Sequence, residues 1–184
     1  MPAIPALPDT HIHTIPRAYR AALEGKADLP GWAMPEYSLA LLKEFLTSLN
    51  ITHPILSGTS PGPPMFGPTE AGRTLARQLN EEVAEEVDAL VAEGWNAGFF
   101  ASLPDFNDVQ GTLEEISWVF ETQKKASGVV VLTNYGDKYE IYVHQMRKTN
   151  LYARLLAHPS FRPIWDKLNE VNALVFVHPT DYLM

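Results

Sequence analysis

Three histidines near the two ends of the chain are the residues best suited to chemistry. His11 and His13 lie in the segment Asp9-Thr10-His11-Ile12-His13, and His178 follows the apolar residues 173–177. Side chains two residues apart in a β-strand point to the same face, so His11 and His13 are expected on one side. If His178 ends a neighbouring parallel strand, three imidazole nitrogens can meet on one Zn²⁺-sized ion. The pattern therefore predicts a metal enzyme.

Composition limits the other ligands and partners of such a site. The chain has 184 residues and no cysteine, so a metal must be held by His, Asp or Glu. A net charge of -8 argues against nucleic acid and anionic membrane surfaces as partners. No apolar stretch approaches 18 residues and no basic leader precedes the first apolar run. We therefore expect a cytoplasmic protein without a membrane span.

Short apolar runs alternate with segments of helical periodicity along the chain. Strands are predicted at about residues 3–7, 51–56, 98–103, 128–133 and 173–177. Helices are predicted at residues 17–24, between Ser38 and Asn50, between Thr69 and Gly94, over 109–120 behind a cap at Asn107 or Asp108, and at 161–170. This alternation predicts a single α/β domain over residues 1–184, with parallel strands and right-handed crossovers.

Residues 140–155 interrupt this alternation. They match neither the helical nor the strand period and are more basic than their surroundings. They also stand where a short loop between a strand and a helix is expected. An atypical insertion, such as sequence that splicing should have removed, is favoured over an active-site lid.

Five segments together carry a more specific pattern than any one of them alone. They are Asp9-x-His11-x-His13, Gly98–Pro104, Thr133–Gly136, His158-Pro159-x-Phe161-x-Pro163-Ile164-Trp165 and Val175–Thr180. Taken together they resemble the decarboxylases of the amidohydrolase superfamily. The similarity is greatest to the aminocarboxymuconate-semialdehyde decarboxylase group, which includes fungal salicylate-type decarboxylases. The resemblance covers nearly the whole chain outside residues 140–155.

The resemblance implies a fold and a ligand set. The family fold is a TIM (β/α)₈ barrel with its site at the carboxyl ends of the strands, so this chain would form a partial barrel of about five βα units. His11 and His13 match the metal ligands after the first strand, and His178 matches the ligand after the fifth. The family's acid/base histidine and aspartate ligand follow the sixth and eighth strands, beyond this chain. Catalytic residues therefore stay unassigned, and Asp181 is not put in the aspartate's place.

Other side chains have a functional and a structural interpretation. Arg17 and Arg20 could hold a substrate carboxylate, although a solvated helix face is favoured. Trp32 could wall a pocket for an aromatic substrate or serve in packing. The acidic run from Glu81 to Asp88 is interpreted as a solvated helix face. His53 is interpreted as a partly buried structural histidine, and His158 as a cap of the helix that follows it.

The resemblance implies a metal-dependent, non-oxidative decarboxylase, a carboxy-lyase of a small aromatic or unsaturated carboxylic acid. Zn²⁺, or alternatively Mn²⁺, would orient the substrate, and an acid would deliver a proton to carbon as CO₂ leaves. Hydrolysis of an amide or lactone is the alternative chemistry. A catalytically dead fragment or an oligomerisation module is the alternative class, because five parallel strands do not close an eight-stranded barrel and their apolar edges favour a homo-oligomer.

Overall fold

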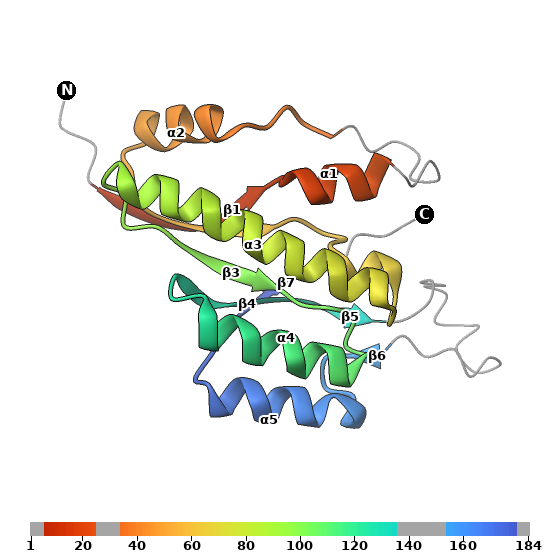
Figure 1. The fold of residues 1–184 in the computed structure, drawn as a ribbon. Coiled ribbons are helices and arrows are strands. Elements are labelled where there is room, and N and C mark those ends of the chain that lie inside the picture. Colours follow the sequence, from red (N-terminus) through yellow and green to blue (C-terminus); the bar gives the residue numbers. More distant parts are fainter. Residues whose placement is uncertain (1–5, 25–33, 136–153, 180–184) are drawn as a thin grey trace, which may run out of the picture.

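The strands form a curled parallel half-barrel (Figure 1). The computed structural model describes residues 6–24, 34–135 and 154–179. One five-stranded sheet has the order β1-β2-β3-β4-β7, and each neighbouring pair is parallel. Its members are β1 (Leu7–Thr14), β2 (Ile51–Gly58), β3 (Gly98–Ser102), β4 (Ala126–Leu132) and β7 (Leu174–His178). The predicted α/β fold, a partial TIM barrel, is confirmed.

Five helices accompany the sheet within the described part of the chain. They are α1 (Arg17–Glu24), α2 (Leu39–Ser48), α3 (Glu70–Ala92), α4 (Val109–Thr122) and α5 (Arg162–Glu170), with 3₁₀ turns η1 (Pro63–Phe66) and η2 (Pro159–Phe161). Each corresponds to a predicted helix. The side chains of Ser38, Thr69 and Asp108 accept hydrogen bonds from backbone N–H groups in the first helical turn, which is how N-caps act. Asp108, and not Asn107, is therefore the cap of α4.

The first strand is displaced from its predicted position. We expected it near residues 3–7, but β1 spans Leu7–Thr14 and contains the histidine pair. Its ladder with β2 runs from Leu7 opposite Ile51 to Thr14 opposite Gly58. Most of its first five residues are exposed, and β1 lacks the run of apolar residues by which a buried strand is recognised in a sequence. Backbone pairing with β2 defines this edge strand, and apolar content does not.

The core lies between the sheet and the helices. Alternate side chains of the central strands, Phe99, Ala101, Val129 and Val131, are fully buried there. They pack with the inward face of α3, represented by Val83, Val87 and Leu90, and with Ile116 and Val119 of α4. Because strand side chains alternate between faces, the intervening residues point to the concave side of the sheet, where the histidines lie.

A buried polar network joins α3, β3 and α4. The Nδ2 group of Asn80 donates to the carbonyl of Ser102 at 2.9 Å and to Oε1 of Glu115 at 2.8 Å. The Ser102 N–H donates to Oδ1 of Asn80 at 2.7 Å. Arg77 completes the network by pairing with Glu115 at 2.8 Å. All these groups have partners, so the network orients the helices without leaving a buried polar atom unsatisfied.

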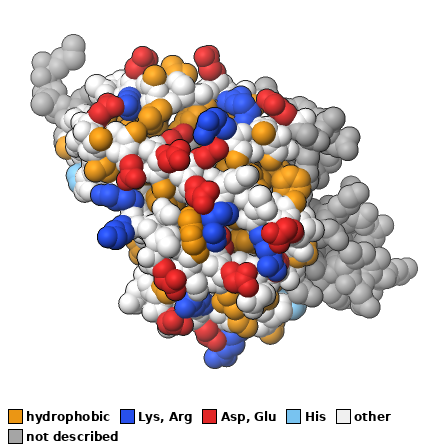
Figure 2. Space-filling view, viewed as in Figure 1, with side chains coloured by type: hydrophobic (Ala, Val, Ile, Leu, Met, Phe, Trp, Pro, Cys, Tyr) orange, Lys and Arg blue, Asp and Glu red, His pale blue; other side chains and the backbone are white. Residues whose placement is uncertain are grey.

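The acidic run on α3 differs in part from its prediction. Figure 2 shows acidic and basic side chains interspersed over the helical face of the molecule. Glu81, Glu85 and Asp88 are exposed as predicted. Glu86, however, is half-buried and accepts hydrogen bonds from the hydroxyls of Thr14 and Tyr37, each at 2.6 Å. The prediction of a uniformly solvated face is wrong for Glu86, because β1 and the segment before α2 pack over it.

Two short strands stand at the borders of the predicted insertion. Strands β5 (Asn134–Tyr135) and β6 (Arg154–Leu155) form an antiparallel pair that the sequence did not predict. The insertion expected at residues 140–155 otherwise lies outside the described residues. Across the described ranges, none of the helices combines the length and hydropathy needed to pass through a lipid bilayer.

Candidate metal centre

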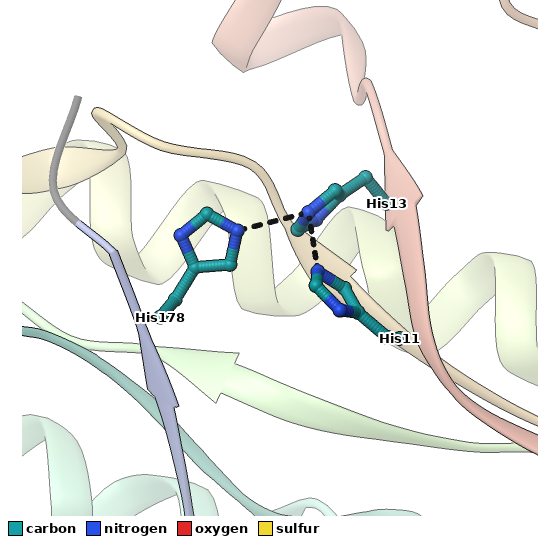
Figure 3. Close-up of side chains that lie close together, drawn as sticks. All are labelled: His11, His13 and His178. Carbon is teal, nitrogen blue, oxygen red and sulfur yellow. Dashed lines mark hydrogen bonds between the residues drawn. The ribbon is translucent and has the colours of Figure 1, made fainter.

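The structure brings His11, His13 and His178 together at the carboxyl end of the sheet (Figure 3). The Nε2 atom of His13 lies 3.1 Å from Nε2 of His11 and 3.1 Å from Nε2 of His178. Each of the three residues offers a nitrogen within 4.8 Å of the others. Among the described residues no carboxylate belongs to this cluster.

Curling of the sheet makes this meeting possible. His11 and His13 lie on β1 and His178 on β7, the two edges of the sheet. Adjacent strands are about 4.8 Å apart, so the edges of a flat five-stranded sheet would be separated by about 19 Å. The ring centroids of His11 and His178 are instead 5.4 Å apart. The curvature therefore creates the site.

Local contacts hold each histidine in place. The Asp9 side chain accepts a hydrogen bond from the backbone N–H of His11 at 3.0 Å, which supports the irregular part of β1. The ring of Phe176 contacts the His11 imidazole edge-on, with centroids 4.9 Å apart. His178 is aligned by its register opposite Leu132 of β4. Asp9 thus supports the backbone at His11 and is not itself part of the cluster.

Contacts at Nδ1 of two of the rings lie on the side away from the cluster. Nδ1 of His178 lies 2.7 Å from the carbonyl oxygen of Pro179, which can only accept, so this nitrogen carries the proton. Nδ1 of His13 lies 3.3 Å from Oγ of Ser57. Burial, followed by the neighbouring His178 and His11, lowers the pKa of His13 and favours its neutral form. A neutral imidazole with its lone pair on Nε2 is able to bind a metal ion.

The donor set fits a divalent transition-metal ion. Two nitrogen ligands of a tetrahedral ion at 2.0–2.1 Å lie about 3.3 Å apart. The two separations of 3.1 Å at His13 are close to this value. Two Nε2 lone pairs at such a distance repel each other unless a cation or proton lies between them. The three histidines could therefore hold such an ion, each through one nitrogen.

The substrate-binding candidates that the structure describes, Arg17 and Arg20, lie on α1. The Arg17 side chain is 89% exposed and lies 3.8 Å from Oε1 of Glu82, consistent with the solvated helix face that was favoured. Trp32 and Asp181 lie outside the described residues. His53 is exposed, so the prediction that it is partly buried is wrong, because β2 turns this residue away from the packed faces. His158 caps η2 by accepting from the Ser160 N–H, as predicted.

A small cavity of about 20 Å³ adjoins His178. Its walls come from the loop after β2 and from the ends of β3 and β4, and include Thr59, Ser60, Ser102, Leu103, Val130, Leu132 and Tyr135. This volume suits one water-sized group.

The sequence did not identify Ser57, Phe100 or Phe176 as site residues. Phe100 and Phe176 stack with centroids 5.4 Å apart beneath the histidines. Ser57 pairs with His13 in the parallel register of β1 and β2. Strand alternation would have placed Phe176 on the face of His178, but the assignment of Ser57 required the register between two strands.

A curled parallel half-barrel flanked by helices, with histidines at the carboxyl ends of its strands, is the arrangement of a partial (β/α)₈ barrel. No protein-family model matches the chain. A 6-methylsalicylic acid decarboxylase of Aspergillus aculeatus is 38% identical over 173 residues, covering 94% of this chain and 47% of the relative. The protein of the same name from Penicillium expansum is 36% identical over 173 residues, covering 94% and 48%. The chain thus spans about half the length of the curated relatives it matches.

Solved structures share the fold. A crystal structure of an amidohydrolase II protein superposes with a TM-score of 0.70 and 26% identity, covering 96% of this chain and 51% of that chain. A dihydroxybenzoic acid decarboxylase from Polaromonas, with bound manganese, superposes with a TM-score of 0.61 and 15% identity, covering 94% and 48%. The chain is therefore a homologue of fungal 6-methylsalicylic acid decarboxylases, with the partial barrel of amidohydrolase-type decarboxylases. The predicted family resemblance is confirmed.

Proposed function

We propose that this chain carries the metal-binding part of a metal-dependent, non-oxidative decarboxylase of a small aromatic carboxylic acid. The observation that carries the proposal is the convergence of His11, His13 and His178 through Nε2 contacts of 3.1 Å. The relatives named 6-methylsalicylic acid decarboxylase supply the substrate class. The metal is a divalent ion, Zn²⁺ by its ligand chemistry or Mn²⁺ by analogy with the manganese-bound neighbour.

The residues of this chain would hold the ion and shape its surroundings. When bound, the ion supplies Lewis acidity that stabilises negative charge on a substrate oxygen. His13 stays neutral because burial and the adjacent imidazoles lower its pKa. Phe100 and Phe176 form an apolar floor beneath the ligands and exclude water from that side. A proton must also reach the carbon that loses CO₂, and no acid in the described part of the chain joins the cluster.

A second candidate is a non-catalytic module that assembles through its sheet edges. The edge strands β1 and β7 carry exposed apolar side chains: Leu7 is 45% exposed, Leu174 63% and Val177 49%. Exposed edges with apolar side chains favour strand pairing with another polypeptide. In this case the histidines would bind metal without turnover, and the chain would form a homo-oligomer.

Metal binding is tested on the full chain before activity. We expect the purified protein to bind about one equivalent of Co²⁺, Zn²⁺ or Mn²⁺, measured by isothermal titration and elemental analysis. His178→Ala should weaken binding by about 100-fold, because an ion with two imidazoles left lacks a protein ligand. His53→Ala is the matched control, since this exposed histidine contacts only Thr52 among the hydrogen bonds observed. Less than a tenth of an equivalent in the unmodified protein would contradict the proposal.

Turnover distinguishes the two candidates. Loss of CO₂ from salicylate-type acids should be followed with and without a chelator, alongside the molar mass in solution. Chelator-sensitive decarboxylation that His178→Ala abolishes supports the enzyme. Stoichiometric metal binding without turnover, together with a stable oligomer, supports the non-catalytic module.

A further inference from the structure

His13 is the central residue of the three-histidine cluster. Its Nε2 atom makes both of the 3.1 Å contacts, one to His11 and one to His178. His11 is exposed, whereas His13 is half-buried between its neighbours. Whatever fixes the orientation and tautomer of His13 therefore affects the whole cluster.

The neighbour that contacts Nδ1 of His13 lies on β2. Ser57 stands opposite His13 in the parallel register, and its Oγ lies 3.3 Å from Nδ1 of the imidazole. The Ser57 side chain is fully buried, with 0% exposure. A hydroxyl at such a position is costly to leave without a partner, whereas Ala or Val would suit a buried strand equally well. The hydrogen bond to His13 accounts for a hydroxyl at this position.

The direction of this contact depends on which of the two neutral forms the imidazole takes. If Nδ1 of His13 donates to Ser57, Nε2 keeps its lone pair and faces the two other rings. If the proton moved to Nε2, it would point into the cluster and block a metal.

We propose that Ser57 is the positioning residue of the central ligand, because its hydroxyl accepts the Nδ1–H of His13 and so keeps the Nε2 lone pair directed at the metal. The part of this inference that concerns affinity rests on the proposed function. The part about the tautomer applies to the metal-free protein and depends only on the hydrogen bond between His13 and Ser57. Groups that orient a ligating histidine in this way usually change metal affinity by 10–100-fold when removed.

The test uses the full chain and two variants that each remove one buried hydroxyl. Ser57→Ala removes the partner of His13. Thr112→Val is the matched control, because Thr112 is also 0% exposed and its hydroxyl donates over the same distance, 3.3 Å, to the carbonyl of Asp105. Long-range ¹H–¹⁵N NMR of the metal-free proteins reports the tautomer of His13, and titration with Co²⁺ reports affinity and the visible spectrum of the site.

We expect the Nδ1–H form of His13 in the unmodified protein and in Thr112→Val, with unchanged Co²⁺ affinity in that variant. In Ser57→Ala the Nε2–H form should appear and Co²⁺ should bind about tenfold more weakly. An Nε2–H tautomer in the unmodified protein, or Co²⁺ affinity of Ser57→Ala within about twofold of the unmodified protein, would overturn the role of Ser57. Failure of the unmodified protein to bind Co²⁺ would instead remove the proposed function, while the NMR comparison still decides the tautomer.

Discussion

The Nε2 atoms of His13 and His178 lie 3.1 Å apart, although 165 positions separate the two residues in the sequence. No local element brings them together. His178 reaches this position because β7 pairs with β4 along its length, from Leu174 opposite Gly128 to His178 opposite Leu132. The placement of His178 therefore depends on the close packing of two strands, and substitutions in their interface test this dependence.

Gly128→Ala is expected to move β7 and weaken metal binding. A Cβ atom at Gly128 would overlap the backbone carbonyl of Leu174, which cannot move without breaking the β4–β7 ladder. We expect a loss of about 1–3 kcal/mol in the free energy of unfolding and a fall in Co²⁺ affinity. Urea denaturation and metal titration measure the two effects. Ser127→Ala in the same strand is the control, and equal affinities of the two variants would show that His178 does not depend on this contact.

Asn80→Ala is expected to destabilise the fold without changing the metal ligands. The substitution removes both hydrogen bonds of the Nδ2 group and leaves the buried N–H of Ser102 without its acceptor. Unsatisfied buried polar groups cost about 1–3 kcal/mol each, so we expect a loss of about 3 kcal/mol in urea denaturation. Gln78→Ala changes an exposed position of the same helix and should stay within about 0.5 kcal/mol. A similar effect of both variants would contradict the role of the network.

Glu86 is expected to make stability fall as pH rises. Burial raises the pKa of Glu86, although the hydroxyls of Thr14 and Tyr37 oppose the shift. The folded state then binds a proton more readily than the unfolded state, so stability decreases with pH from the ordinary carboxyl range, about 4.3, up to the raised value.

The test of this slope is Glu86→Gln, which keeps an acceptor oxygen for both hydroxyls and removes the charge. The variant should match the unmodified protein near pH 4 and become relatively more stable towards pH 7, as followed by thermal unfolding. Tyr37→Phe removes one donor to the carboxylate and should make the fall of stability steeper. Parallel stability curves for Glu86→Gln and the unmodified protein would rule out this role of Glu86.

Asp108 combines a helix cap with an ion pair, and two substitutions separate them. Its carboxylate accepts from the Gly111 N–H at 3.1 Å and from Nε and Nη2 of Arg73 at 2.5 and 2.7 Å. Asp108→Asn keeps a good cap but loses the charge, and we expect a loss of about 1 kcal/mol because the Arg73 side chain is 36% exposed and partly screened. Asp108→Ala loses both and should cost about 2 kcal/mol by urea denaturation.

The pH dependence of this pair has the opposite sign to that of Glu86. Burial alone would raise the pKa of Asp108, but the hydrogen bonds from Arg73 hold it below the ordinary value. Ionised Asp108 therefore stabilises the folded state at neutral pH. This stabilisation is lost as the pH falls through and below the usual carboxyl range. Asp108→Asn should differ most from the unmodified protein at neutral pH and least in acid. A stability difference between Asp108→Asn and the unmodified protein that grows in acid would contradict this role of the Asp108–Arg73 pair.

Helix boundaries were predictable because their signals are local. The cap residues Ser38 and Thr69 and the end of α3 before Gly94, which has a φ of 102°, were all evident in the sequence. Strand β1 was not, because Leu7–Thr14 is a strand only through its ladder with β2. The pair β5 and β6 escaped prediction for the same reason. Glu86 was misjudged because its burial depends on which distant segments cover α3.

The sequence by itself determined the residue types of the site, the alternation of strands and helices, and the similarity to decarboxylases. Only the tertiary structure decided that His11 and His178 meet, with centroids 5.4 Å apart, and that Ser57 stands behind His13. The physical reason is that a strand's face follows from local alternation, whereas the curl of five strands and their register follow from packing against helices that lie far away in the chain.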